Sequence, residues 1–151
     1  LWNNAPMTMT AQQLIQTLGL APHPEGGHYI ETWRASNDGR PCGTAIYFLL
    51  QGHENNHWHK VDATEIWHYH AGAPLVLSLS ASDKGPAQDH MLGPNLGAGQ
   101  RPQVIVPPGH WQKARSTGAW TLVGCTVSPG FEFDGFTLAA DGFDIPLQSN
   151  S

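Results

Sequence analysis

Residues 57–72 read HWHKVDATEIWHYHAG, and this stretch decides the expected fold and the candidate site. Alternate residues of a β-strand point to the same face, and the stretch reads as two short strands separated by a turn. His57 and His59 then share one face of the first strand. Glu65 begins the second strand, where it can lie opposite them. Two imidazoles and a carboxylate on neighbouring strands make a good site for a first-row metal ion.

The second strand of this stretch has two chemically different faces. Glu65, Trp67 and Tyr69 lie on one face, and His68 and His70 lie on the other. If Glu65 points inward, both histidines point outward as surface or dimer-interface groups. A register slip of one residue would invert this assignment and make the histidines a second metal-binding pair.

The rest of the chain predicts more strands of the same kind. Turn signals rich in Gly, Pro and Asn separate short β-branched and aromatic runs, which favours an antiparallel sandwich or barrel. The expected strands are 28–33, 44–50, 57–61, 65–70, 75–80, 88–92, 103–106, 112–115, 120–126 and 136–139.

One helix is expected, over 11–18. Thr10 can cap it, its apolar residues fall on one face, and Gly19 stands where a helix ends. The fold class is therefore all-β with one short N-terminal helix. We expect a loose N-terminal extension over 1–9, one domain over 10–143 and a polar tail over 144–151.

Composition excludes several classes of protein. The 151 residues fit one domain, and a net charge of −5 leaves no basic surface for nucleic acid. No run of about 18 apolar residues predicts a membrane span, and the first residues do not resemble a secretory signal. Two cysteines cannot form a disulfide framework. We therefore expect a cytoplasmic protein, with nine histidines against seven Lys and Arg as its unusual feature.

The spacing of the metal-site residues resembles the first motif of the cupin superfamily. That motif is HxH, three or four residues, E, six residues and G, and His57, His59, Glu65 and Gly72 follow it with a gap of five residues before the glutamate.

The second cupin motif is PxG, two residues and H. Residues 107–109 supply PPG, but Gln112 stands at the histidine position. The carbonyl oxygen of Gln112 can bind a metal ion, although it is a weaker ligand for softer ions.

Five blocks in the same order resemble one subfamily of small bacterial and fungal cupins, long carried as a domain of unknown function. They are PHPEGG at 22–27, TAIYFLL at 44–50, ATEIWHYHAGAPL at 63–75, RPQVIVPPGHWQKA at 101–114 and LVGCTVSPGFEFDGFTLA at 122–139. The resemblance implies a jelly-roll β-barrel with an internal pocket, a homodimer, and kinship to dTDP-sugar epimerases and germin-type cupins. It implies no settled reaction.

These observations give three sets of candidate residues. A divalent transition metal (Fe, Mn, Ni, Cu or Zn) would bind His57, His59, Glu65 and Gln112. The candidate catalytic residues are His59, Glu65 and Tyr69. The candidate ligand-binding residues are Tyr47, Trp67, Trp111 and Glu25, with plain core packing as the alternative for the aromatic rings.

Three functions are compatible with this site. The first is a metal-dependent enzyme, an oxidoreductase or isomerase, acting on a small polar molecule. The second is a metal-free sugar epimerase in which His59 is the general base and a tyrosine the acid. The third is a binding module for a sugar or small metabolite without turnover. If the ligand carries a phosphate or carboxylate, we expect Arg34, Lys60, Arg101 or Arg115 near the pocket.

Overall fold

The predicted N-terminal helix is present. The computed structural model describes residues 9–149, and α1 covers Ala11–Leu18. The Thr10 side chain accepts a hydrogen bond from the backbone N–H of Gln13 (3.1 Å), and the Gln13 side chain accepts one from the Thr10 N–H (2.8 Å). Gly19 ends the helix in the left-handed conformation (φ 69°). Leu14 is buried in a cluster that includes Leu49 of the neighbouring sheet.

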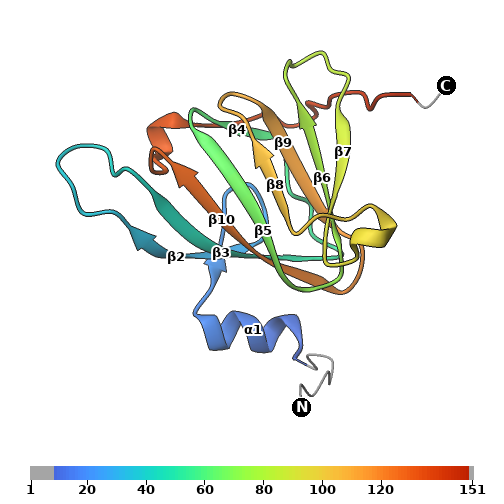
Figure 1. Ribbon diagram of the computed structural model, residues 1–151, viewed down its shortest axis with the longest axis horizontal. Helices are drawn as coiled ribbons and strands as arrows, with labels where there is room; N and C mark the ends of the chain where they lie inside the picture. The colour runs from blue at the N-terminus through green and yellow to red at the C-terminus, as the bar shows by residue number, and fades with distance from the viewer. Residues whose placement is uncertain (1–8, 150–151) are drawn as a thin grey trace.

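Two antiparallel sheets make up the rest of the chain (Figure 1). The six-stranded sheet has the order β1 (Ala21–Pro22), β2 (His28–Arg34), β3 (Thr44–Gln51), β10 (Trp120–Ser128), β5 (Thr64–Gly72) and β8 (Gln103–Val106). The five-stranded sheet has the order β11 (Phe136–Leu138), β4 (His59–Val61), β9 (Trp111–Ser116), β6 (Leu75–Ser80) and β7 (Gln88–Leu92). Two 3₁₀ turns, η1 (Leu96–Ala98) and η2 (Phe133–Gly135), lie in the connections.

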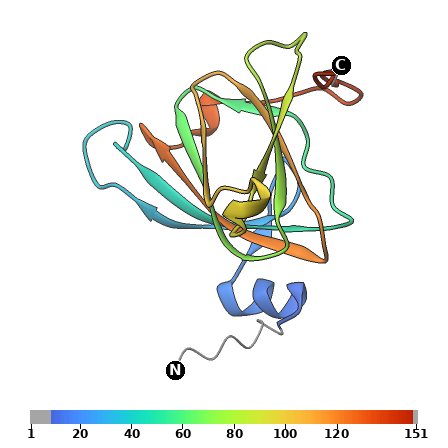
Figure 2. The same ribbon diagram turned by 45° about the vertical axis from the view of Figure 1, so that its right-hand side comes forward.

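The two sheets enclose the main hydrophobic core (Figure 2). Its buried residues are Phe48, Leu50, Trp67, Leu75, Leu77, Leu79, Leu92, Val106, Ala114, Val123 and Cys125. Strands β5 and β10 send alternate residues into this core, as the pattern of the sequence predicts. The prediction of an all-β jelly roll with one N-terminal helix is confirmed.

Strand β2 contains a β-bulge that determines which of its side chains face inward. Glu31 pairs with Ile46 of β3, but the next pair is Trp33 with Ala45, so Thr32 is an extra residue. The alternation of faces therefore changes after Glu31. Arg34 follows on the same side as Glu31, and Trp33 is left 54% exposed.

The segment expected as a polar tail packs against the domain as far as Gln148. Ile145 is buried (2% exposed) in a cluster with Trp58 and Trp111, and Leu147 forms a bridge with Ala87. The buried Ile145 side chain and backbone hydrogen bonds of Ala87 with Pro146 and Gln148 (2.8 Å each) hold a segment whose composition is polar. Of the expected extension over 1–9, residues 1–8 lie outside the described residues. No helix within 9–149 is long and apolar enough to cross a membrane.

Candidate functional site

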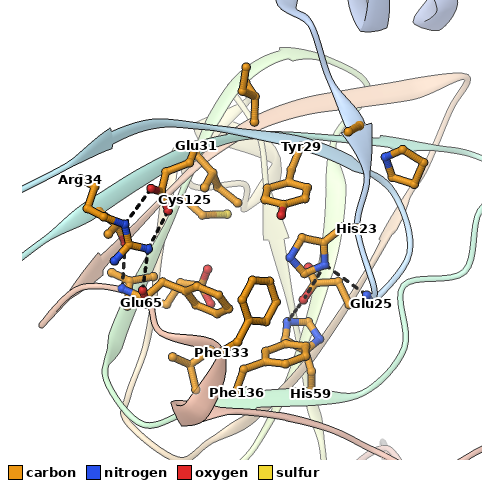
Figure 3. A pocket seen from close by; sticks show the side chains of 18 of the residues that line it. His23, Glu25, Tyr29, Glu31, Arg34, His59, Glu65, Cys125, Phe133 and Phe136 are labelled. Carbon is orange, nitrogen blue, oxygen red and sulfur yellow. Dashed lines mark hydrogen bonds and ion pairs between the residues drawn. The ribbon is translucent and has the colours of Figure 1, made fainter. Parts of the chain in front are cut away.

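A cavity of about 440 Å³ lies between the two sheets at the end of the barrel where β2, β4 and β11 meet. Figure 3 shows two polar clusters on opposite sides of it, with aromatic rings between them. Its lining residues are Gly19, Ala21, Pro22, His23, Glu25, Tyr29, Ile30, Glu31, Arg34, Thr44, Ile46, His59, Val61, Glu65, Cys125, Val127, Phe131, Phe133 and Phe136.

Glu25 and His59 form the first polar cluster. Glu25 Oε2 lies 2.9 Å from His59 Nε2, and both side chains are almost fully buried. His59 Nδ1 donates a hydrogen bond to the carbonyl oxygen of His57 (2.8 Å), so this nitrogen carries a proton. The second nitrogen therefore shares one further proton with the Glu25 carboxylate.

The loop before β2 brings Glu25 into contact with His59. Gly26 has φ 99°, and a Cβ atom there would lie 2.0 Å from the carbonyl oxygen of Asn55. Only glycine allows this backbone approach, which is closed by a hydrogen bond from the His57 N–H to the Glu25 carbonyl (2.8 Å). The Gly26-Gly27 pair thus places the Glu25 side chain against the strand that carries His59.

Opposing effects fix the charges of this pair. Burial alone would raise the pKa of Glu25, but His59, His23 and Asn56 together hold the pKa of this carboxyl below its ordinary value. Burial would likewise lower the pKa of His59, but Glu25 outweighs it and the pKa is raised. We therefore assign a carboxylate and an imidazolium.

His23 is the neutral neighbour of this ion pair. Its Nδ1 accepts a hydrogen bond from the backbone N–H of Glu25 (3.1 Å) and so carries no proton. Burial lowers the pKa of His23, and the nearby His59 charge adds to this effect although Glu25 opposes it. His23 also packs edge-on against Tyr29, with ring centroids 4.5 Å apart.

The Glu65 side chain reaches the cavity from β5, and hydrogen bonds on the side away from the cavity fix its position. The amide of Gln112 donates to Glu65 Oε1 (2.7 Å), and the Trp67 indole N–H donates to Gln112 Oε1 (2.7 Å). Because an indole nitrogen can only donate, the carbonyl end of Gln112 must face Trp67 and its NH₂ end must face Glu65. Cys125 of the neighbouring strand β10 lines the same cavity as Glu65.

The pKa of Glu65 is shifted in the opposite direction to that of Glu25. Burial and the nearby Glu25 carboxylate raise the pKa of Glu65 to about 7, although His59, Gln112 and Cys125 partly oppose the shift. One cavity thus contains a carboxylate at Glu25 and a carboxyl group at Glu65 that carries a proton near neutral pH.

Glu31 and Arg34 form the second polar cluster. The Arg34 guanidinium donates to both oxygens of Glu31, at 2.9 Å each. Its Nη2 also donates to the carbonyl oxygen of Phe131 (2.9 Å), and its Nη1 lies 3.8 Å from Glu132. This cluster joins β2 to the segment that follows β10.

Aromatic rings fill the space between the two polar clusters. Phe131, Phe133 and Phe136 pack edge-to-face against one another, with centroids 4.9 to 6.1 Å apart. Tyr29 faces them, and its hydroxyl group points toward the middle of the cavity in Figure 3. The cavity is therefore mostly apolar with a few convergent polar groups, as small-molecule sites are.

The structure brings Glu25, His59 and Glu65 together but leaves His57 out. The residue precedes β4, and its Nε2 lies 3.0 Å from the carbonyl oxygen of Ala140. The spacing of His57 and His59 predicts that they share one face of a strand. This prediction is wrong because β4 begins only at His59, so His57 lies outside the strand. Gln112 lies behind Glu65 and does not line the cavity.

Four predicted aromatic residues also lie away from the cavity. Trp67 belongs to the main core, and Trp111 packs at 5.0 Å against Phe143. Tyr47 lies with His70 on the outer face of the six-stranded sheet (6.0 Å between centroids), and the Tyr69 hydroxyl donates to the Gly72 carbonyl (2.7 Å). For Trp67 and Trp111, core packing is the role that the structure supports.

His68 and His70 lie outside the barrel, as the inward orientation of Glu65 requires. His68 Nε2 is 3.1 Å from the Thr126 hydroxyl, and its Nδ1 is 3.3 Å from the Gln103 amide. The expected outward orientation of these two histidines agrees with the structure.

The side chains do not fit the expected metal ion in this arrangement. Within residues 9–149, no three His, Cys, Asp or Glu side chains converge in a way that can hold a metal ion. His59 Nε2 is directed at Glu25, and the only oxygen ligand that Gln112 has is directed at Trp67. The four-ligand set predicted from the motif spacing is therefore not assembled.

Several lining residues are missing from the sequence prediction. Tyr29 and Glu31 of β2 face the cavity, and His23 supports Glu25. Arg34, one of the four basic residues expected near the pocket, faces the cavity as well. Alternation along the expected strand would have placed Tyr29 and Glu31 on one face, but the bulge that adds Arg34 to this face leaves no clear signal in the sequence.

Comparison with known proteins identifies the family. The model of the family described as Cupin superfamily (DUF985) matches residues 12–139. The protein SO0799 from Shewanella oneidensis is 38% identical over 88% of this chain and 86% of its own, with a TM-score of 0.83. A hypothetical protein from Leishmania major is 32% identical over 85% and 86%, with a TM-score of 0.78.

More distant structures share the fold alone. The Streptomyces nucleoside dehydratase Pac13 is 12% identical over 80% of this chain and 82% of its own, with a TM-score of 0.55. No curated protein matches the sequence. With its double-sheet barrel and a family match over most of its length, the chain belongs to the DUF985 family of the cupin superfamily.

Proposed function

We propose that the protein is an enzyme that catalyses proton transfer on a small, hydroxyl-bearing molecule in the barrel cavity, with Glu25 as the base and Glu65 as the acid. The observation that carries this proposal is the presence of two buried carboxyl groups in one cavity. Glu25 is paired with the His59 imidazolium, whereas the surroundings of Glu65 favour its protonated, uncharged form. Environments that push two pKa values apart are typical of acid–base pairs in enzymes.

Glu25 suits the role of base because it is ionised and fixed in position. His59 holds Oε2, and the backbone of the Gly26-Gly27 loop sets the direction of the side chain. Loss of a substrate proton to Glu25 would leave negative charge on the substrate. The His59 imidazolium is close enough to Glu25 to stabilise that charge.

Glu65 suits the role of acid because its pKa of about 7 lies near the working pH. Gln112 donates to its Oε1 from the side away from the cavity, and the Glu65 side chain itself lines the cavity, where a ligand can reach it. The Tyr29 hydroxyl is a further hydrogen-bond donor that lines the same cavity.

This pair is suited to isomerisation or to loss of water. In an isomerisation, Glu25 removes a proton from a carbon next to a carbonyl group, and Glu65 delivers one to the resulting enolate. In a dehydration, Glu65 instead protonates the leaving hydroxyl group, so that water and an alkene form. In both cases Glu25 ends protonated and Glu65 ionised, and solvent restores the starting state. The fold likeness to a nucleoside dehydratase is compatible with the second reaction but shows the fold alone.

The test is hydrogen exchange in deuterated water. Chelator-treated protein is incubated with a panel of hydroxy-carbonyl compounds and free sugars, and deuterium incorporation is read by mass spectrometry. Because general acid–base groups contribute about 10²–10⁴-fold, Glu25→Gln and Glu65→Gln should each reduce the exchange rate by at least about 100-fold. Tyr47→Phe, on the outer face of the sheet, is the matched control and should leave the rate unchanged.

Metal content discriminates the proposal from the metal-dependent alternative. For an ion to bind at His59 and Glu65, His59 would have to release Glu25, and Gln112 would have to turn away from Trp67. If exchange is lost on chelation and returns with a divalent transition metal, the acid–base proposal is wrong and the prediction from the cupin motif is right.

A further inference from the structure

The charges around the cavity limit the ligands that it can accept. Arg34 is the only arginine or lysine among the described residues that line the cavity, and all of its nitrogens already face oxygen atoms. Glu31 binds it through two hydrogen bonds, and Glu132 lies on its remaining side. An anionic ligand could reach the guanidinium without displacing Glu31 only at Nη1, and there the Glu132 carboxylate lies 3.8 Å away.

The other end of the cavity is also charge-neutral. His59 is cationic but lies 2.9 Å from Glu25, which neutralises it. His23 uses Nδ1 to accept a hydrogen bond from the Glu25 backbone, so it adds no charge. Each cation that lines the cavity therefore has its own carboxylate.

Glu65 is a carboxyl group without a cation of its own. Its hydrogen-bond partner is the Gln112 amide, which is uncharged, and burial keeps the neighbouring Cys125 thiol uncharged by raising its pKa. As soon as Glu65 ionises, the cavity carries a net negative charge. Buried charges need a partner, so a phosphate or carboxylate placed here would be costly.

The space between the charged clusters is apolar and aromatic. The rings of Phe133, Phe136 and Tyr29 bound it, and aliphatic side chains such as those of Ile46 and Val127 add to the lining. Such a wall packs well against a flat ring or the apolar face of a sugar. The volume of about 440 Å³ is within the range of small-molecule sites.

We infer that the substrate is an uncharged, ring-bearing molecule, and that the Glu31–Arg34 pair makes the cavity reject phosphorylated and carboxylated analogues. This inference rests on the proposed function only in calling the ligand a substrate. The pairing of Arg34 with Glu31 does not support the expectation that this arginine binds a phosphate or carboxylate of the ligand.

The experiment measures binding of matched uncharged and anionic probes by chemical shift changes in ¹H–¹⁵N spectra. One pair is phenyl β-D-glucoside with phenyl β-D-glucuronide, which differ only in a carboxylate. The other pair is benzyl alcohol with benzoate. In each pair in which the uncharged probe binds, it should bind at least about tenfold more tightly than its anion, because each cation of the cavity is already paired with a carboxylate and Glu65 adds a negative charge when it ionises. The shifts should centre on Tyr29, Phe133 and Phe136.

Glu31→Gln tests whether the ion pair is the cause. Removal of this carboxylate leaves Arg34 with a free charge at the cavity, so the preference for the uncharged probe should fall by at least about fivefold. The Glu31 side chain is one-third exposed (33%), so the variant should fold. Glu132→Gln is the matched control, because Glu132 lies farther from Arg34 (3.8 Å) and should change the preference little.

Three results would overturn the inference. These are equal or tighter binding of the anions by the wild-type protein, an unchanged preference in Glu31→Gln, and no binding by either uncharged probe. Binding is measured without turnover. A failure of charge selectivity is therefore distinct from a failure of proton exchange, which concerns Glu25 and Glu65.

Discussion

Gln112 shows how a single side chain is given its role by its neighbours. Its position in the sequence suggests a metal ligand, but the indole of Trp67 takes its carbonyl oxygen and leaves its NH₂ group for Glu65. A donor at this distance favours the ionised form of Glu65, so Gln112 moderates the effect of burial. The residue thereby tunes the proposed acid.

The raised pKa of Glu65 predicts a pH-dependent stability. The folded chain binds this proton more tightly than the unfolded chain, in which the carboxyl group has its ordinary value of 4.5. The stability from this group is fully present below pH 4.5 and is lost as the pH rises through about 7. Glu65→Gln abolishes this loss.

Relative to wild type, the unfolding free energy of Glu65→Gln should therefore rise by about 3 kcal/mol between about pH 4.5 and pH 8. Urea unfolding of both proteins at the two pH values measures the difference. A difference that does not change with pH would show that Glu65 has an ordinary pKa.

The ion pair at the other polar cluster predicts a shift in His59. Burial opposes the charge of this imidazole, and Glu25 is the main group that sustains it. In Glu25→Gln we expect the pKa of His59 to fall below its ordinary value of 6.5. Titration of the imidazole ¹⁵N shifts measures this.

Glu54→Gln is the control, since this carboxylate lies 3.7 Å from His28 and not beside His59. If the pKa of His59 is the same in Glu25→Gln as in the wild-type protein, the assigned ion pair between Glu25 and His59 is wrong.

At the scale of single elements, strand ends and bulges decide what reaches the cavity. Strand β4 begins at His59, so His57 lies before the strand and does not point to the same face as His59, although its spacing suggests that it would. In β2, the extra Thr32 turns Arg34 inward beside Glu31. A one-residue change in register is invisible in a pattern of period two until the partner strand is known.

The loop over His23–Gly27 gives a prediction for one element. Gly26→Ala places a Cβ atom against the Asn55 carbonyl at a positive φ, so it should destabilise the fold by more than about 2 kcal/mol and displace Glu25. Gly39→Ala is matched in φ (74°) but has open space around it, and should cost about 1 kcal/mol.

Thermal or urea unfolding of the two variants gives the comparison. An equal loss of unfolding free energy in the two variants would mean that the backbone at Gly26 is not in close contact with the Asn55 carbonyl.

For the whole molecule, the sequence predicts the architecture better than the site. The helix and the ten expected strands follow from local periodicity, turn residues, the cap at Thr10 and the helix end at Gly19. His59 and Glu65 are also predicted, by the spacing of the cupin motif, and Glu25 is predicted from the PHPEGG block at 22–27. The orientation of Gln112 and the inward turn of Arg34 depend on contacts between distant segments, which no local pattern contains.

The C-terminal segment predicts a contrast between two aliphatic residues. Ile145 is 2% exposed and fills a cluster against Trp58, whereas Leu147 is 56% exposed. Ile145→Ala should lower the unfolding free energy by about 2–4 kcal/mol. Leu147→Ala should change it by less than about 0.5 kcal/mol. Similar effects of the two substitutions in urea unfolding would contradict the packing of this segment.

The resemblance to other cupins predicts a homodimer, and light scattering tests it. The expected mass is twice the 16.4 kDa of the chain, and a value of one chain at micromolar concentration would refute the expectation.

The chain of hydrogen bonds from Trp67 through Gln112 to Glu65 has a practical consequence. The indole proton of Trp67 senses the charge on Glu65 through one intervening amide. Its resonance is one of only six of its kind, because the sequence contains six tryptophans. The protein therefore has a built-in spectroscopic probe, which reports protonation of the cavity and the arrival of a ligand without any label attached to the site.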